Sequence, residues 1–126
     1  MFKKIVVWNI MLLSLYATDI VVDTQTNLAW YDSEDPYIVN WKHADSYCSE
    51  LEVEGYTDWR LPSEEELVAL AKDEALKKRF MNLWEQVFWT DDNGIFNATT
   101  VYSGNGFVSS TDNCEKFATI CVRKTN

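Results

Sequence analysis

The eight residues Gly55-Tyr56-Thr57-Asp58-Trp59-Arg60-Leu61-Pro62 lie between two segments with helical patterns and divide this chain of 126 residues. Gly55 favours the end of a helix, because glycine adopts backbone conformations that other residues avoid. After Pro62, Ser63 and Glu66 have the spacing of a capping box, and apolar residues at helical spacing follow: Leu67, Leu70 and Ala71. The sequence therefore predicts that one helix ends near Gly55 and another begins near Ser63.

The segment before this motif predicts a strand hairpin and then an amphipathic helix. Residues 20–22 and 28–31 are β-branched, apolar or aromatic, and the polar residues 23–27 between them suit a turn. Apolar residues then recur at helical spacing: Trp41, Ala44, Tyr47, Cys48 and Leu51. The buried face of this helix would carry Cys48.

The segment after the motif changes from a helical to a strand pattern. Leu76, Phe80, Leu83 and Trp84 continue an apolar helical pattern, either within the second helix or as a separate short one. Residues 87–90, 99–102, 107–108 and 118–123 then predict antiparallel strands, with residues 91–94 as a turn. We expect an α+β fold in which two helices pack on short antiparallel strands and the N- and C-terminal strands pair.

Composition and charge limit the function. With 47% hydrophobic and 14% aromatic residues, the chain can build one core, so we expect one domain. The formal net charge is −9. Such a surface repels phosphate backbones and anionic lipid headgroups, so we expect no nucleic acid partner and no membrane-surface partner. A neutral glycan or a protein remains as a partner.

The first residues have the order of a secretory signal peptide. A short basic region with Lys3 and Lys4 precedes an apolar stretch that ends at Ala17. This stretch is shorter than the roughly 20 residues that a spanning helix needs. We expect residues 1–17 to be removed, so that no stable membrane insertion remains, residues 18–126 form the domain, and the charge of −9 becomes −11 without the two lysines. The mature protein would be periplasmic or secreted.

Three cysteines, Cys48, Cys114 and Cys121, would then reach an oxidising compartment where thiols pair. In the chain-entropy model, the long loop from Cys48 to Cys121 gives on the order of 4 kcal/mol of stabilisation, and the short loop from Cys114 to Cys121 gives less. This ranking favours the first pairing but leaves the connectivity open.

The order of these elements and their motifs resembles the DUF1566 family, also named after the C-terminal domain of the Lcl adhesin. The shared motifs are Thr26-Asn27-Leu28-Ala29-Trp30, Trp41-Lys42-His43-Ala44-Asp45-Ser46-Tyr47-Cys48, Gly55 to Pro62 with Glu66-Leu67 after it, Phe88-Trp89-Thr90-Asp91 and Cys121-Val122-Arg123. The resemblance implies a C-type-lectin-like fold with a disulfide from Cys48 to Cys121. Asn27 replaces the usual glycine, which Asn tolerates because it also adopts positive φ. Cys114 lacks a fourth cysteine for a second lectin-type bridge.

Candidate site residues fall into three groups. The motif residues Asp58, Trp59, Arg60, Leu61 and Pro62 are better explained as a structural corner than as a binding site. Trp89, Tyr102 and Phe107 are candidates for a ligand-facing aromatic surface. Asp91, Asp92 and Asn93 offer oxygen ligands to a metal, but they lack the EF-hand spacing, and a solvated hairpin tip explains them as well. We expect no metal and no cofactor.

Three functions are compatible with these features. The first is an exported recognition domain of the adhesion type that binds a glycan or a protein. The second is a cysteine enzyme of the formylglycine-generating type, which shares the lectin-like fold but needs a reactive cysteine pair. The third is a structural envelope domain without a small ligand. Because the bridge would consume two of the three cysteines, we expect the protein not to be an enzyme.

Overall fold

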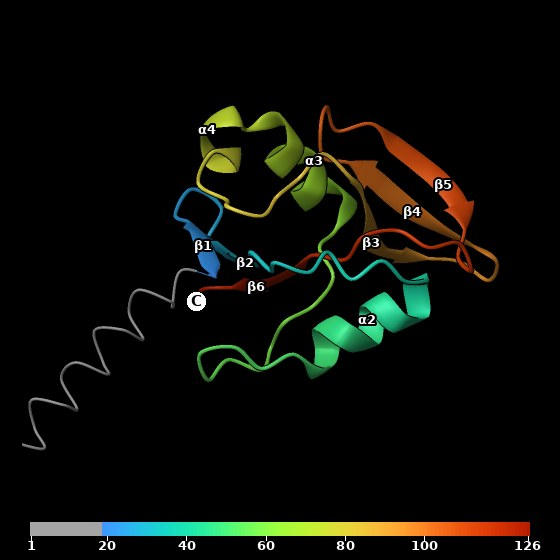
Figure 1. Cartoon of the computed structure of the whole chain (residues 1–126), viewed down its shortest axis with the longest axis horizontal. Helices are drawn as coiled ribbons and strands as arrows, with labels where there is room; N and C mark the ends of the chain where they lie inside the picture. Colours follow the sequence, from blue (N-terminus) through green and yellow to red (C-terminus); the bar gives the residue numbers. More distant parts are fainter. Residues whose placement is uncertain (1–18) are drawn as a thin grey trace, which may run out of the picture.

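A computed structural model describes residues 19–126, so the predicted signal peptide at residues 1–17 lies outside the described residues. The chain forms two antiparallel three-stranded sheets and three helices within this range (Figure 1). The strands are β1 (Ile20–Asp23), β2 (Leu28–Tyr31), β3 (Val87–Asn93), β4 (Asn97–Tyr102), β5 (Val108–Asp112) and β6 (Cys121–Lys124). The helices are α2 (Trp41–Glu50), α3 (Glu64–Lys72) and α4 (Glu74–Lys77). The predicted mixture of helices and antiparallel strands is confirmed.

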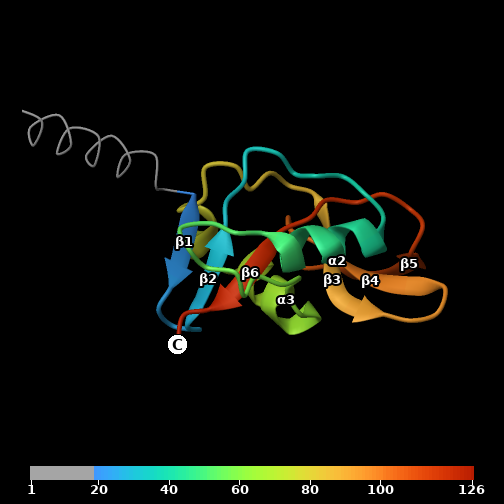
Figure 2. The same ribbon diagram turned by 90° about the horizontal axis from the view of Figure 1, so that it is seen from below.

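The first sheet joins the two ends of the domain in the order β1-β2-β6. β2 pairs with β6, with Trp30 opposite Val122. The turn between β1 and β2 places Asn27 at φ 57°, the positive value that glycine or Asn accepts. Figures 1 and 2 both show the C-terminus beside this hairpin. The sheet therefore closes the chain on itself through pairing of segments about 90 residues apart in sequence.

The two longer helices begin at side-chain caps. The side chain of Asn40 accepts a hydrogen bond from the N–H of His43 at the start of α2. Ser63 and Glu66 form the predicted capping box at the start of α3, each side chain accepting from the other residue's N–H. These caps satisfy N–H groups that have no partner within the helix. α2 and α3 lie on opposite sides of the strands in Figure 1.

The helical pattern after α3 does not extend to Trp84. A short separate helix, α4, ends at Lys77, and Asp73 caps its start. The carboxylate of buried Asp32 then accepts hydrogen bonds from the N–H groups of Met81 and Asn82, at 2.7 and 2.9 Å. Because these N–H groups bond to Asp32 rather than to helical carbonyls, the segment is not helical. Of the two alternatives for this segment, the separate short helix is confirmed, and the expected layout of two helices is corrected to three.

Two apolar cores fill the space between these elements. The first contains Leu67, Leu70 and Val122 and lies between α3 and the first sheet. The second lies against the buried face of α2 and contains Trp89 and both bridging cysteines. Their side chains are almost completely buried. β3 runs between the cores, since Phe88 belongs to the first and Trp89 to the second.

Candidate functional site

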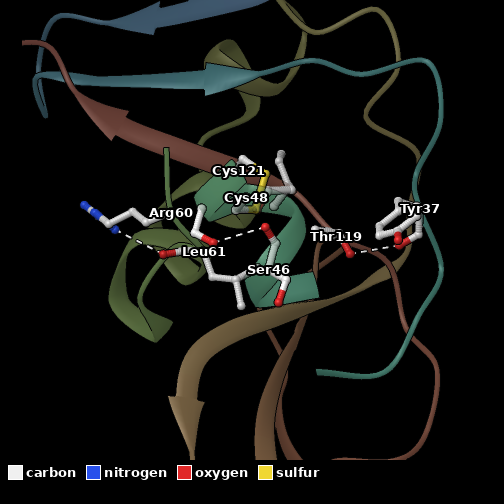
Figure 3. Close-up of a disulfide and its surroundings, with 9 residues drawn as sticks. Tyr37, Ser46, Cys48, Arg60, Leu61, Thr119 and Cys121 are labelled. Atoms are coloured by element: carbon white, nitrogen blue, oxygen red, sulfur yellow. Dashed lines mark hydrogen bonds between the residues drawn. A yellow bond between two sulfur atoms is a disulfide. The ribbon is translucent and has the colours of Figure 1, made fainter. Parts of the chain in front are cut away.

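The disulfide joins α2 to the start of β6. Cys48 and Cys121 are bonded, with their Cα atoms 5.4 Å apart, and Figure 3 shows the bridge between the two elements. Both residues are buried in the second core. Beside the bridge, the hydroxyl of Thr119 donates to the carbonyl of Tyr37. The predicted pairing is confirmed, and the third cysteine, Cys114, is free and exposed.

The central motif forms a structural corner around Trp59 and Arg60. Arg60 exchanges two main-chain hydrogen bonds with Val122 of β6, at 2.9 and 2.8 Å. Its guanidinium binds both carboxylate oxygens of Glu66, at 2.8 and 2.9 Å. Trp59 is 3% exposed, and its indole donates to the carbonyl of Tyr56. Leu61 and Pro62 are buried as well.

The remaining charge of this motif is paired with the last strand. Asp58 lies 2.6 Å from Nε of Arg123, and this hydrogen bond lowers the pKa of the carboxyl group. The guanidinium of Arg123 stacks 3.7 Å above the ring of Tyr56. Since Arg60 and Arg123 each have a carboxylate partner, neither guanidinium is free to hold a ligand carboxylate.

The Arg60–Glu66 pair gives a pH-dependent contribution to stability. The hydrogen bond from Arg60 lowers the pKa of Glu66 below its ordinary value of 4.5. The ionised carboxylate therefore stabilises the fold above pH 4.5, and this contribution is lost as the pH falls through the folded-state pKa. Glu66→Gln keeps a side chain that can serve the capping box but removes the charge. We expect it to lower the free energy of unfolding by about 1 kcal/mol at neutral pH and by much less near pH 3.

Urea denaturation of both proteins at several pH values measures this difference. Glu115→Gln removes the same charge from an exposed position and serves as the control. A Glu66→Gln deficit that stays constant from neutral pH to about pH 3 would contradict the assigned ion pair.

The three aromatic residues expected to face a ligand have different environments. Trp89 is 0% exposed, and its indole donates to the carbonyl of Val39 at 2.8 Å, so the prediction for Trp89 is wrong. The side chain of Trp89 is buried because both faces of β3 pack against other elements at this position. Tyr102 is half-buried, and its hydroxyl donates to Glu85, which raises the pKa of Tyr102. Phe107 is exposed.

The weak metal candidates Asp91, Asp92 and Asn93 lie at the end of β3 rather than in the turn. Asp92 accepts from the hydroxyl of Thr99, and Asn93 accepts from the side chain of Asn113. The turn itself lies at residues 94–96, after an irregular register in β3. Within residues 19–126, no group of three His, Cys, Asp or Glu side chains is placed to hold a metal ion.

The turn between β3 and β4 carries two adjacent, highly exposed large apolar residues. Ile95 is 86% exposed and Phe96 is 76% exposed. Together with Gly94 they are called the hairpin tip. Sequence reasoning missed these residues, although two large apolar side chains directly after a glycine and a polar run are a signal for an apolar turn.

The hairpin tip is held by one residue, Asn113, from the segment after β5. Nδ2 of Asn113 lies 3.2, 3.4 and 3.3 Å from acceptor oxygens of Asn93, Gly94 and Ile95. The N–H of Asn113 donates to the carbonyl of Phe96 at 2.9 Å. These contacts fix the backbone of the turn, so that its apolar side chains are presented in a defined geometry.

The chain matches the model of a known protein family. The model of the Lcl C-terminal domain matches residues 19–123. The chain belongs to the Lcl C-terminal domain family. The resemblance stated from the sequence motifs is therefore confirmed. No curated protein matches the sequence.

Two solved structures share the fold of this Lcl C-terminal domain. Botrocetin matches with a TM-score of 0.57 and 15% identity, over 84% of this chain and 96% of that chain. A chain of the complex between a mutant von Willebrand factor A1 domain and botrocetin matches with a TM-score of 0.56 and 11% identity, over the same shares. At this identity the likeness establishes a C-type-lectin-like fold and nothing about ligands.

The Lcl C-terminal domain thus presents a family motif in which Trp59, Leu61 and Pro62 are buried and the charges of Asp58 and Arg60 are paired, and it presents an exposed apolar hairpin tip. In residues 19–126, no helix is long and apolar enough to cross a membrane. The hairpin tip has no titratable group among its three residues, and it offers apolar area and backbone carbonyls. Its chemistry suits contact with another surface rather than acid–base or nucleophilic catalysis.

Proposed function

We propose that this Lcl C-terminal domain is an extracytoplasmic recognition domain that binds a protein partner through its hairpin tip. The observation that carries the proposal is the exposure of Ile95 and Phe96, at 86% and 76%, on a turn fixed by Asn113. A soluble chain seldom leaves two adjacent large apolar side chains in water without an interaction that uses them.

Location outside the cytoplasm is supported by the disulfide. A buried bridge between Cys48 and Cys121 persists in oxidising compartments and is rare in the cytosol. The signal-peptide pattern in residues 1–17 agrees with export. The proposal covers both the periplasm and the cell exterior.

A protein partner fits the surface better than a glycan. Sugar sites need several directed polar groups beside an aromatic plane, whereas the hairpin tip offers aliphatic and aromatic area. The net charge of −9, which becomes −11 without residues 1–17, favours a partner surface that is neutral or basic around an apolar pocket. The solved botrocetin complex has a protein partner, the von Willebrand factor A1 domain, and an equivalent class of partner is proposed for this chain.

Absence of enzymatic activity is part of the proposal. An enzyme of the formylglycine-generating type would need a reactive cysteine pair, and Cys48 and Cys121 are joined and buried. The remaining thiol, of Cys114, has no other free cysteine in the chain to act with. A structural envelope domain without a ligand remains the alternative that a binding experiment distinguishes.

The test compares binding of the purified domain and a tip variant to arrayed extracellular proteins and to a glycan array. Ile95→Ser/Phe96→Ser is expected to lower affinity for the protein partner at least about tenfold, because central apolar anchors carry most of an interface's binding energy. Folding should be unchanged, since both side chains are exposed.

The matched control is Met81→Ser, because Met81 is 76% exposed and lies in another segment. It should bind like the wild-type domain. Binding only to glycans, or undiminished binding by the tip variant, would contradict the proposal. No binding to either array would favour the structural envelope domain.

A further inference from the structure

The outer edge of β5 is an open sheet edge. β5 is the last strand of the second sheet, in the order β3-β4-β5, and Figure 1 shows it at the outer side of the molecule. Two other sheet edges are covered by main chain. Ala118 bonds to Val87 and Trp89 along β3, and Arg60 bonds to Val122 along β6. Within residues 19–126, no segment pairs with the outer side of β5 in this way.

The register of β4 and β5 shows which main-chain groups point outward. At one end of β5 the N–H of Tyr102 donates to the carbonyl of Phe107, and at the other the N–H of Asn113 donates to the carbonyl of Phe96. Between these two bonds the pairing runs without a shift. Hydrogen-bonded and non-hydrogen-bonded pairs alternate along an antiparallel ladder. The outward main-chain groups therefore belong to alternate residues of β5: Val108, Ser110 and Asp112.

These outward groups can pair with another strand. In the part of the chain that the structure describes, no hydrogen bond outside the sheet uses the N–H groups of the three residues or the carbonyls of Val108 and Ser110. The carbonyl of Asp112 accepts from the N–H of Glu115 and keeps a second lone pair. Proteins commonly protect an edge strand with lysine, proline or a bulge. β5 has none of these, so its edge is a template for strand addition.

The sequence of β5 suits antiparallel pairing with a second copy of β5. A twofold axis at Ser110 places this residue opposite itself and Val108 opposite Asp112 of the other copy. All the outward residues then face outward residues, as a hydrogen-bonded ladder requires. The hydroxyls of Ser109 and Thr111 face each other, which is a favourable cross-strand pair. Asp112, the only charged residue of the strand, faces a valine rather than a second carboxylate.

Charges near the two ends of β5 are complementary in this arrangement. Asp112 and Glu115 are exposed at one end. At the other end, the side chain of Lys72 lies beside Gly106, is exposed, and forms no ion pair within 4.0 Å in the described structure. The antiparallel pairing brings this lysine of one copy to the acidic end of the other, once on each side of the axis. These contacts offset part of the repulsion between two copies of net charge −9.

We propose that the domain associates with a second copy of itself by antiparallel pairing of the two β5 strands about an axis at Ser110. The three-stranded sheets of the two copies then join into one continuous sheet. The inference goes beyond the proposed function, because the pairing uses the main chain of β5 and not the side chains of Ile95 and Phe96.

Sedimentation equilibrium of the disulfide-bonded domain up to about 1 mM measures this association. The protein carries Cys114→Ala, so that no disulfide between copies contributes. We expect a reversible equilibrium between monomer and dimer with a dissociation constant below about 1 mM. Ser110→Pro removes the outward N–H at the axis and should weaken the dimer at least about tenfold, because two symmetric hydrogen bonds are lost. Ser110→Ala keeps this N–H and is the matched control.

Charged side chains at the axis test the register directly. Ser110→Asp and Ser110→Lys each place like charges opposite each other only if residue 110 faces itself. Each variant alone should therefore dimerise at least about tenfold more weakly. An equimolar mixture of the two variants should form the dimer again, because opposite charges then face each other. Ser49→Asp and Ser49→Lys carry the same charges at an exposed position of α2 and should dimerise like the Cys114→Ala protein.

Several outcomes would overturn the inference. These are a monomer at all concentrations up to about 1 mM, undiminished association of Ser110→Pro, or a mixture of the charged variants that stays monomeric. Circular dichroism checks that each variant is folded, and the charged pair decides if Ser110→Pro is not. The hairpin-tip variant Ile95→Ser/Phe96→Ser should still dimerise, so failure of the proposed function leaves this result interpretable.

Discussion

Replacing both bridging cysteines, Cys48→Ala/Cys121→Ala, is expected to lower the free energy of unfolding by about 4 kcal/mol. The bridge closes a loop with a sequence separation of 73 residues, so its removal frees a large part of the unfolded chain. Small domains are stable by only roughly 5–15 kcal/mol, so this loss is a major fraction of the total. The variant also leaves a void in the second core, because both side chains are buried there.

Urea denaturation, followed by circular dichroism, measures the loss. The double substitution is made in a Cys114→Ala background so that no thiol can form another bridge, and the Cys114→Ala protein alone is the control. Because Cys114 is exposed and free, the control should keep the wild-type midpoint. Equal stability of the triple variant and the control would contradict a stabilising role of the bridge.

Trp89→Ala is expected to cost about 3–5 kcal/mol, the range for removing a large buried aromatic side chain. Trp89 is 0% exposed and lies edge-on to Phe117, with ring centroids 5.2 Å apart. Its indole hydrogen bond to the carbonyl of Val39 also disappears, which leaves that carbonyl without this donor. The substitution removes contacts from the same core that contains the disulfide.

The matched control is Trp84→Ala, since Trp84 is 66% exposed and its carbonyl, which bonds to Ser103, remains. We expect it to change stability by less than about 0.5 kcal/mol. Thermal and urea unfolding of the two variants should therefore differ clearly. Similar stabilities would mean that Trp89 is not the core residue described above.

Sequence patterns predicted most of the elements whose formation depends on residues close together in the chain. The capping box of Ser63 and Glu66 and the helical spacing of Ala44 and Cys48 are short-range features, and each predicted its helix. The family resemblance supplied the pairing of Cys48 with Cys121, which loop entropy favoured but left open. The helical pattern beyond α4 was misleading because its apolar residues pack without a helix around Asp32.

The direction of the strand side chains was harder to predict. Alternation separates buried from exposed residues only when one face of a strand meets water. In β3, Phe88, Trp89 and Thr90 are all buried, because the strand passes between two cores. No period in the sequence indicates this two-sided burial, and Trp89 was therefore assigned to the surface.

The sequence by itself determined the helix starts, the α+β class, the acidic charge and the family, since these follow from residues close together or from ordered motifs. Only the tertiary structure decided which apolar residues remain in water and which sheet edge stays open. The exposure of Phe96 depends on Asn113 from another segment, and the open edge of β5 depends on the order of the strands in the second sheet. Such properties arise from contacts between segments distant in the chain, whose geometry local patterns do not encode.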